Sequence, residues 1–143
     1  MKYLLDTCVV SELSKKHPSE SVLRWFESVE EDDLLVSSVT IGELRKGIEM
    51  LADDDARRLV LEAWYNSVVS CFGHRIVQYD KDIAVEWGRI VGRAMREGNA
   101  RSPLDMQIAA TAFKFGMTLV TRNIRDMQGV GVLLLNPFEQ APS

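Results

Sequence analysis

Short apolar runs alternate with longer amphipathic segments along this chain, and that alternation limits its fold more than any other feature. The apolar runs have the length of strands and are bounded by polar or turn-forming residues. We expect strands at residues 2–5, 34–39, 75–79, 117–121 and 132–135. Strands that alternate with helices form a parallel sheet whose two faces are covered by the helices. The sequence therefore predicts an α/β fold with a parallel sheet.

The segments between these strands carry apolar residues at the 3.6-residue spacing of helices. We expect helices at residues 9–16, 19–30, 40–51, 54–72, 81–97 and 103–115. Asp80 is positioned to cap the helix that follows it, and Gly73 and Gly116 are positioned to end two others. A length of 143 residues suits one domain, residues 1–143, with a single sizeable core.

The sequence gives no sign of a membrane segment or of a disulfide framework. No apolar run is long enough to span a bilayer, and the apolar start is too short for a signal peptide. Cys8 and Cys71 are the two cysteines, and no Cys-x-x-Cys or Cys/His cluster suggests zinc. We therefore expect a reduced, cytoplasmic compartment and no membrane partner.

Four acidic residues lie at places where strands end or helices begin. Asp6 follows the first strand, Glu43 lies in the first turn of the helix after the second, and Asp126 lies in the loop after the fourth. Asp105 opens the helix over residues 103–115, which rises about 20 Å and so must start at the carboxyl edge of the sheet. We expect all four acids at that edge, where open α/β sheets bind ligands.

Each acid also has a structural explanation. Thr40 and Glu43 have the spacing of a capping box, as do Ser102 and Asp105. Asp6 could cap the next helix, and Asp126 could be a solvated loop residue. Carboxylates that share one edge would repel each other, however, and a hard divalent cation is the usual remedy. Oxygen ligands of this kind suit Mg²⁺ or Mn²⁺, so the acids together predict a metal site.

The charge of the chain is uneven. The formal net charge of −4 argues against bulk nucleic-acid binding. Basic residues nevertheless gather between positions 89 and 125: Arg89, Arg93, Arg96, Arg101, Lys114, Arg122 and Arg125. We therefore expect a local basic surface on an acidic protein. Arg122 and Arg125 lie beside the acidic edge and could hold phosphates, or they could be solvated loop charges.

Four blocks of the sequence carry a family resemblance. They are "LLDTCVVSEL", "SSVTIGELRKGI", "SPLDMQIAATA" and "TLVTRNIRDMQGVGVLLLNP". In this order and spacing they resemble the motifs of PIN-domain ribonucleases, most closely the VapC and FitB type of toxin in bacterial toxin–antitoxin pairs. The likeness covers residues 2–137. It implies a three-layer α/β/α fold with a five-stranded parallel sheet and a metal-dependent endoribonuclease. One position departs, because Met127 stands where the family commonly has Phe.

The resemblance also assigns roles to residues. It implies that an acidic quartet is formed by Asp6, Glu43, Asp105 and Asp126, with Thr7, Thr121 and Asn123 at nearby polar positions. Asp6 and Asp105 would bind Mg²⁺ or Mn²⁺ most directly, and the other two acids would complete the site or help to hold a second ion. The substrate would be RNA, hydrolysed by in-line attack of a metal-bound water on a phosphodiester.

A toxin of this kind implies a cognate antitoxin protein and a homodimer or a higher toxin–antitoxin assembly. The two helices expected between residues 9 and 30 offer several apolar side chains that could line a groove for a partner helix: Val10, Leu13, Val22, Leu23, Trp25 and Phe26. A basic side chain of the partner could then pair with the acids and displace the metal. The alternative is a non-catalytic module that docks a basic peptide within a DNA-binding repressor complex.

Overall fold

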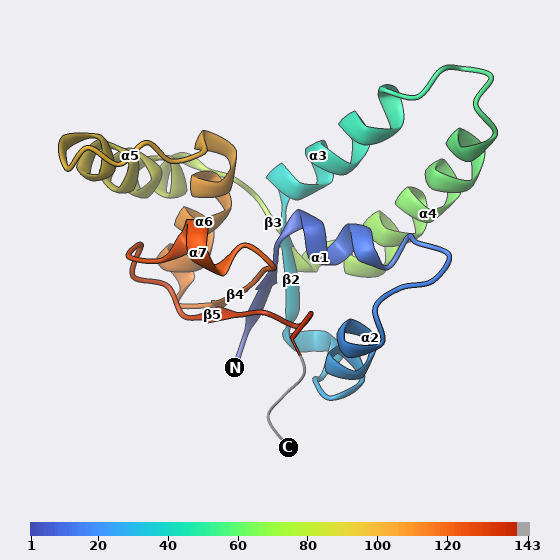
Figure 1. Ribbon diagram of the computed structural model, residues 1–143, viewed down its shortest axis with the longest axis horizontal. Coiled ribbons are helices and arrows are strands. Elements are labelled where there is room, and N and C mark those ends of the chain that lie inside the picture. The colour runs from blue at the N-terminus through green and yellow to red at the C-terminus, as the bar shows by residue number, and fades with distance from the viewer. Residues whose placement is uncertain (140–143) are drawn as a thin grey trace.

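A parallel sheet forms the centre of the molecule (Figure 1). The structure is a computed structural model that describes residues 1–139. Over these residues five strands pair in the order β3-β2-β1-β4-β5, and every pair is parallel. The strands are β1 (Tyr3–Leu5), β2 (Leu34–Ser37), β3 (Ile76–Val77), β4 (Thr118–Val120) and β5 (Leu134–Leu135). The predicted five-stranded parallel sheet is confirmed.

The order of the strands creates a switch point beside β1. The chain first builds outward on one side of β1, through β2 to β3, and later enters β4 on its other side. Leu5 pairs with Val120 in the register of β1 and β4, so these two strands end at the same level. The residues that follow them, Asp6 and Thr121, therefore meet at the carboxyl edge, where ligands bind in sheets of this kind.

Helices cover both faces of the sheet. They are α1 (Thr7–Glu12), α2 (Glu20–Glu27), α3 (Ser38–Glu49), α4 (Ala56–Phe72), α5 (Lys81–Arg96), α6 (Pro103–Phe115) and α7 (Ile124–Met127), with 3₁₀ turns at Glu31–Asp33 and Gly73–Arg75. Figure 1 shows α5 and α6 on one side of the sheet, α1, α2 and α4 on the other, and α3 projecting alongside α4. This is the predicted three-layer α/β/α arrangement.

The two buried residues of β1 show how the layers are held. Successive side chains of a strand point to opposite faces. Leu5 packs in a cluster with residues of α1 and α4, such as Val10 and Phe72. Leu4 packs in a second cluster with residues of α6, such as Met106 and Ala109. The core is therefore double, with one apolar layer on each face of the sheet. No helix in the described part of the chain has the length and hydropathy needed to cross a membrane.

Several predicted helix ends are confirmed and others are wrong: the helices expected at residues 9–16 and 19–30 are α1 (Thr7–Glu12) and α2 (Glu20–Glu27). Asp80 caps α5 by accepting from the Ile83 N–H at 3.0 Å, and Gly116 ends α6 in the left-handed conformation with φ of 63°. The helix predicted to start at Thr40 instead starts at Ser38, because Ser37 already caps it by accepting from the Val39 N–H. The Thr40 to Glu43 capping box is therefore not formed, and Glu43 lies in the second turn of α3 rather than the first.

Candidate functional site

Asp6 is buried at the switch point and both of its carboxylate oxygens are hydrogen-bonded. Oδ1 accepts from the Thr7 N–H at 2.8 Å, which caps α1. Oδ2 accepts from the hydroxyl of Thr121, the residue that follows β4, at 2.7 Å. The side chain is 3% exposed. Asp6 is therefore a helix cap, as one reading of the sequence expected, and at the same time its carboxylate is fixed at the ligand-binding edge.

Thr121 connects Asp6 to the polypeptide that leaves β4. Its hydroxyl donates to Asp6 and accepts from the Asn123 N–H at 3.0 Å. A hydroxyl that both donates and accepts cannot rotate freely, so the orientation of the Asp6 carboxylate is set by the backbone after β4. Asn123, predicted as a nearby polar residue, contributes its backbone N–H to this chain of hydrogen bonds.

Glu43 reaches the same edge from α3. Its Oε1 accepts from the Thr7 hydroxyl at 2.7 Å, and Thr7 Oγ1 also lies 3.2 Å from Thr40 Oγ1. Thr7 thus contacts two of the four acids, Asp6 through its N–H and Glu43 through its hydroxyl. Thr40 was interpreted from the sequence as a helix cap. The structure instead places it beside the site.

Asp105 lies in the first turn of α6 and is half-buried. Ser102 caps this helix, and its hydroxyl accepts from the Asp105 N–H at 3.4 Å. Burial raises the pKa of Asp105, and the negative charges of Asp6, Glu43 and Asp126 raise that pKa further. The other three predicted acids are therefore close enough to act electrostatically on Asp105. The four carboxylates, contributed by four separate segments, share one edge of the sheet.

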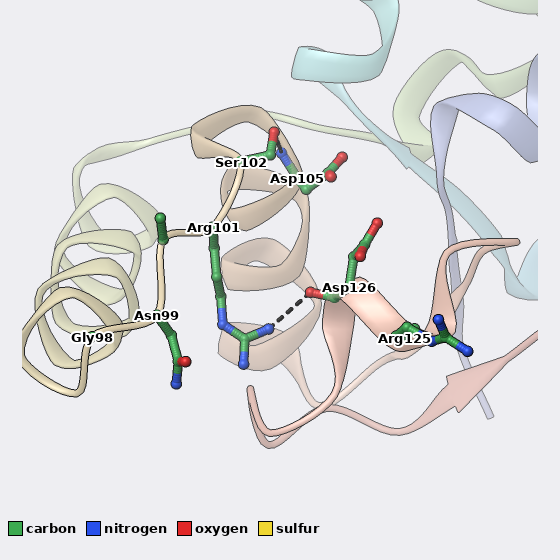
Figure 2. Close-up of a pocket in the computed structure, with 8 residues that line it drawn as sticks. Gly98, Asn99, Arg101, Ser102, Asp105, Arg125 and Asp126 are labelled. Carbon is green, nitrogen blue, oxygen red and sulfur yellow. Dashed lines mark hydrogen bonds between the residues drawn. The ribbon is translucent and has the colours of Figure 1, made fainter.

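Asp126 is exposed and lies in the single turn of α7, where the sequence predicted a loop. It lines a pocket of about 510 Å³ with Asp105 and with residues 98–102, which precede α6. Figure 2 shows the carboxylates of Asp105 and Asp126 extending toward the same side of this pocket. The backbone carbonyl of Asp126 accepts from Arg101 Nη1 at 2.8 Å. The sequence marks Arg101 only as one basic residue among several between positions 89 and 125.

The donor set of this edge consists of carboxylate and hydroxyl oxygens, which are ligands for hard divalent cations. Within residues 1–139, no three acidic, histidine or cysteine side chains converge closely enough to hold an ion by themselves. The four carboxylates therefore share one edge without forming a closed cage. This chemistry fits Mg²⁺, which usually keeps several waters and takes only one or two carboxylates from the protein.

Cys8 is half-buried beside Asp6, with Sγ 3.8 Å from Asp6 Oδ2 and 3.9 Å from Thr121 Oγ1. Burial raises the pKa of the Cys8 thiol, and the charge of Asp6 raises it further. Because the thiolate is the nucleophilic form, this environment disfavours a nucleophilic role for Cys8.

The two arginines predicted to contact phosphates have different surroundings. Arg125 lines the pocket and lies on the same turn as Asp126. In Figure 2 its side chain extends away from Arg101. The Arg122 guanidinium is exposed and lies 3.6 Å from the centre of the Phe138 ring, a cation–π contact that engages it outside the pocket. Arg125 is therefore the better placed of the two for a ligand at the acidic edge.

Comparison with known proteins agrees with this geometry. The model of the PIN domain family matches residues 3–131. Toxin FitB of Neisseria gonorrhoeae is 31% identical over 135 residues, which are 94% of this chain and 97% of FitB. VapC ribonuclease Y4jK of Sinorhizobium fredii is 29% identical over 96% of this chain and 99% of its own. The solved structure of FitAB bound to an IR36 DNA fragment superimposes with a TM-score of 0.88, at 30% identity over 98% of each chain. The chain therefore belongs to the PIN domain family and, within it, to the VapC/FitB ribonuclease toxins of toxin–antitoxin systems.

Proposed function

We propose that this ribonuclease toxin is an endonuclease that requires Mg²⁺ or Mn²⁺ held by Asp6, Glu43, Asp105 and Asp126. The observation that carries the proposal is the convergence of the four acids: Thr7 bonds both Asp6 and Glu43, and Asp105 and Asp126 line one pocket. The raised pKa of Asp105, caused by burial and then by the other three acids, agrees with this placement. Such repulsion costs stability unless a cation offsets it. Oxygen ligands from four separate segments are the donor set that Mg²⁺ and Mn²⁺ prefer.

The side chains have distinct tasks in this proposal. Asp6 and Asp105 are the principal ligands, and Glu43 and Asp126 complete the site. Thr121 and Thr7 hold the carboxylates of Asp6 and Glu43 in one orientation through hydrogen bonds of 2.7 Å each. When bound, the cation supplies a water of lowered pKa and neutralises charge on the phosphate. The helix dipole of α6 favours negative charge at Asp105 in the first turn of that helix.

Arg125 is proposed to hold a phosphate of the RNA next to the cleaved bond. It is exposed, it is one of the residues that line the pocket, and it lies in α7 directly before Asp126. Contacts between arginine and phosphate position a nucleic acid without reading its sequence. The proposed substrate class is therefore RNA bound along the acidic edge, with Arg125 offsetting the repulsion between phosphate and carboxylates.

We also propose that a cognate antitoxin protein restrains the toxin by covering α1 and α2. Of the apolar residues expected to line a groove there, Val10 and Val22 are buried in the core. Leu23 is 39% exposed, and Trp25 and Phe26 are half-buried against the core. These three side chains leave apolar surface for a partner helix, and a basic residue elsewhere in that partner would pair with the carboxylates. Self-association through other apolar helix faces is part of the same proposal.

The decisive experiment is a cleavage assay on purified protein with end-labelled RNA. Cleavage with Mg²⁺ or Mn²⁺, its loss in chelator, and its loss in Asp6→Asn and Asp105→Asn are the expected results. A parental rate for Asp6→Asn, in a preparation free of contaminating nuclease, would contradict the metal site and favour a non-catalytic docking module.

A growth experiment tests the partner. Cells that express the parent alone should stop growing, whereas cells that express Asp6→Asn, or the parent with the neighbouring open reading frame, should grow. Equal growth of all strains at matched protein levels would contradict the antitoxin proposal.

A further inference from the structure

Asp126 lies in α7, a helix that is too short to be stable without contacts to the rest of the fold. Helix α7 has four residues, and an isolated turn of this length is unstable in water because helix nucleation is unfavourable. Asn123, at the start of α7, makes no side-chain cap bond to it within the described residues. Met127 is 1% exposed and anchors one side of the turn in the core. A second contact is needed to fix the turn where Asp126 points outward.

Arg101 supplies that contact through two hydrogen bonds. Its Nη1 donates to the carbonyl of Asp126 at 2.8 Å, and its Nη2 donates to the carbonyl of Gln128 at 2.7 Å. Figure 2 shows the Arg101 side chain reaching from the segment before α6 to the turn that carries Asp126. The planar guanidinium donates from a rigid fork, so the two carbonyls are held relative to each other as well as to Arg101.

The guanidinium lies close to the backbone after Gln128. Gly129 follows the second carbonyl and has φ of 84°, a conformation that favours glycine. A Cβ at this position would lie 3.4 Å from Arg101 Nη2, an ordinary contact distance. Glycine is therefore favoured here by the shape of the turn on which Arg101 packs.

We propose that Arg101 is a positioning residue that sets the distance between Asp105 and Asp126 by joining the segment before α6 to the α7 turn. Arg101 lies one residue before Ser102, the cap of the helix whose first turn carries Asp105. The Arg101 side chain therefore connects the start of α6, which carries Asp105, with the α7 turn, which carries Asp126. This inference rests on the proposed function of the four acids. The competing role is direct contact with RNA phosphate, because Arg101 also lines the pocket.

The test compares Arg101→Gln, Arg101→Lys, Asp126→Asn and the double variant Arg101→Gln/Asp126→Asn, with Arg96→Gln as control. Arg96 is an exposed arginine in the last turn of α5, outside the site. Arg101→Gln should lower kcat by about tenfold, the lower end of the effect of removing a residue that orients ligands. The KM for RNA should stay at the parental value. Arg101→Lys should recover only part of the rate, because a single ammonium cannot reproduce the fork.

Two further measurements separate positioning from RNA contact. Arg101→Gln should add no further loss in the Asp126→Asn background, since the misplaced carboxylate is already gone. Without RNA, Arg101→Gln should weaken Mn²⁺ binding in calorimetry and speed amide hydrogen exchange over residues 124–129. Arg96→Gln should change neither. If Arg101→Gln does not fold, the same measurements on Arg101→Lys carry the test.

The outcomes distinguish this inference from the proposed function. Parental cleavage by Asp6→Asn and Asp105→Asn would contradict the function itself. If those two variants are inactive, a raised KM with unchanged kcat in Arg101→Gln, or losses that multiply in the double variant, would overturn positioning in favour of phosphate contact. A parental rate for Asp126→Asn would also overturn it, because Arg101 would then have no functional carboxylate to position.

Discussion

The Thr121 hydroxyl donates a 2.7 Å hydrogen bond to Asp6 Oδ2, and both side chains are buried. The two residues follow β4 and β1, the neighbouring strands at the switch point of the sheet. A carboxylate buried there without such a donor would lose hydration that nothing replaces. The hydrogen bond from Thr121 therefore allows the Asp6 carboxylate to be buried at the edge of the sheet where the acids lie.

Replacing Thr121 by valine tests this relationship, because valine keeps the shape of threonine and removes the hydroxyl. Thr121→Val should lower the free energy of unfolding by about 1–3 kcal/mol, the cost of leaving a buried acceptor unpaired. Cleavage should fall by about 10–100-fold, since Asp6 loses the group that orients it. Thr111→Val is the matched control: its buried hydroxyl bonds the Gln107 carbonyl within α6, and its loss should leave cleavage unchanged. Equal rates for both variants would contradict an orienting role for Thr121.

Neutralising Asp105 should stabilise the protein in chelator. Burial and the other three acids raise the pKa of Asp105, so its charged form is disfavoured in the folded state. We expect Asp105→Asn to melt slightly above the parent, because Asp105 is only half-buried and solvent screens part of the repulsion. Mn²⁺ should then raise the melting temperature of the parent more than that of the variant. A lower melting temperature in chelator would instead assign Asp105 a helix-capping role.

The two arginines after β4 should respond differently to substitution. Arg125→Gln should raise the KM for RNA and leave the melting temperature unchanged, because Arg125 lies at the pocket and its side chain is exposed. Arg122→Gln should lower the free energy of unfolding by about 0.5–1 kcal/mol, the size of an exposed cation–π contact, here with Phe138. Steady-state kinetics and denaturant unfolding of both variants provide the comparison. A rise in KM confined to Arg122→Gln would reverse the assignment.

The lowered pKa of Glu12, a residue outside the acidic quartet, predicts that the stability of the fold depends on pH. Its pKa is lowered, chiefly by the hydrogen bond from Lys15 at 2.8 Å, then by the Ser19 N–H, with a smaller effect of the Arg122 charge. A carboxyl whose pKa is lower in the folded state stabilises the fold above its unfolded pKa, about 4.3. That stabilisation is lost as the pH falls through the lower, folded pKa.

Glu12→Gln is the variant that tests this dependence. At pH 7 it should be less stable than the parent, and the difference should shrink steadily as the pH falls below about 4.3. Denaturant unfolding from pH 7 to pH 3 measures both proteins. Glu20→Gln, an exposed acid in the first turn of α2, serves as control. A parent–variant difference that is constant with pH would show that packing, rather than charge, accounts for the role of Glu12.

Local patterns in the sequence were sufficient for the order and type of the main elements. The alternation of apolar runs with helical periodicity predicted the parallel sheet, because a strand and a helix bury their side chains with different periods. Caps such as Asp80 and Gly116 were predictable because their partners lie within a few residues. The acidic edge followed from topology, since every parallel strand ends at the same side.

Tertiary structure decided the contacts that complete the site. Glu43 lies one turn further into α3 than predicted, because the helix is capped by Ser37 and not by Thr40. The hydrogen-bond partner of Glu43 is Thr7, which lies in α1, far from Glu43 in the sequence. Arg101 donates hydrogen bonds to the backbone carbonyls of residues 126 and 128. These bonds could not be predicted from the sequence, because every residue has a backbone carbonyl. Such pairs depend on strand register and side-chain rotamers, which are set only when the two layers pack on the sheet. The sequence by itself therefore determined which edge of the sheet carries the acids, and packing decided how each one is held there.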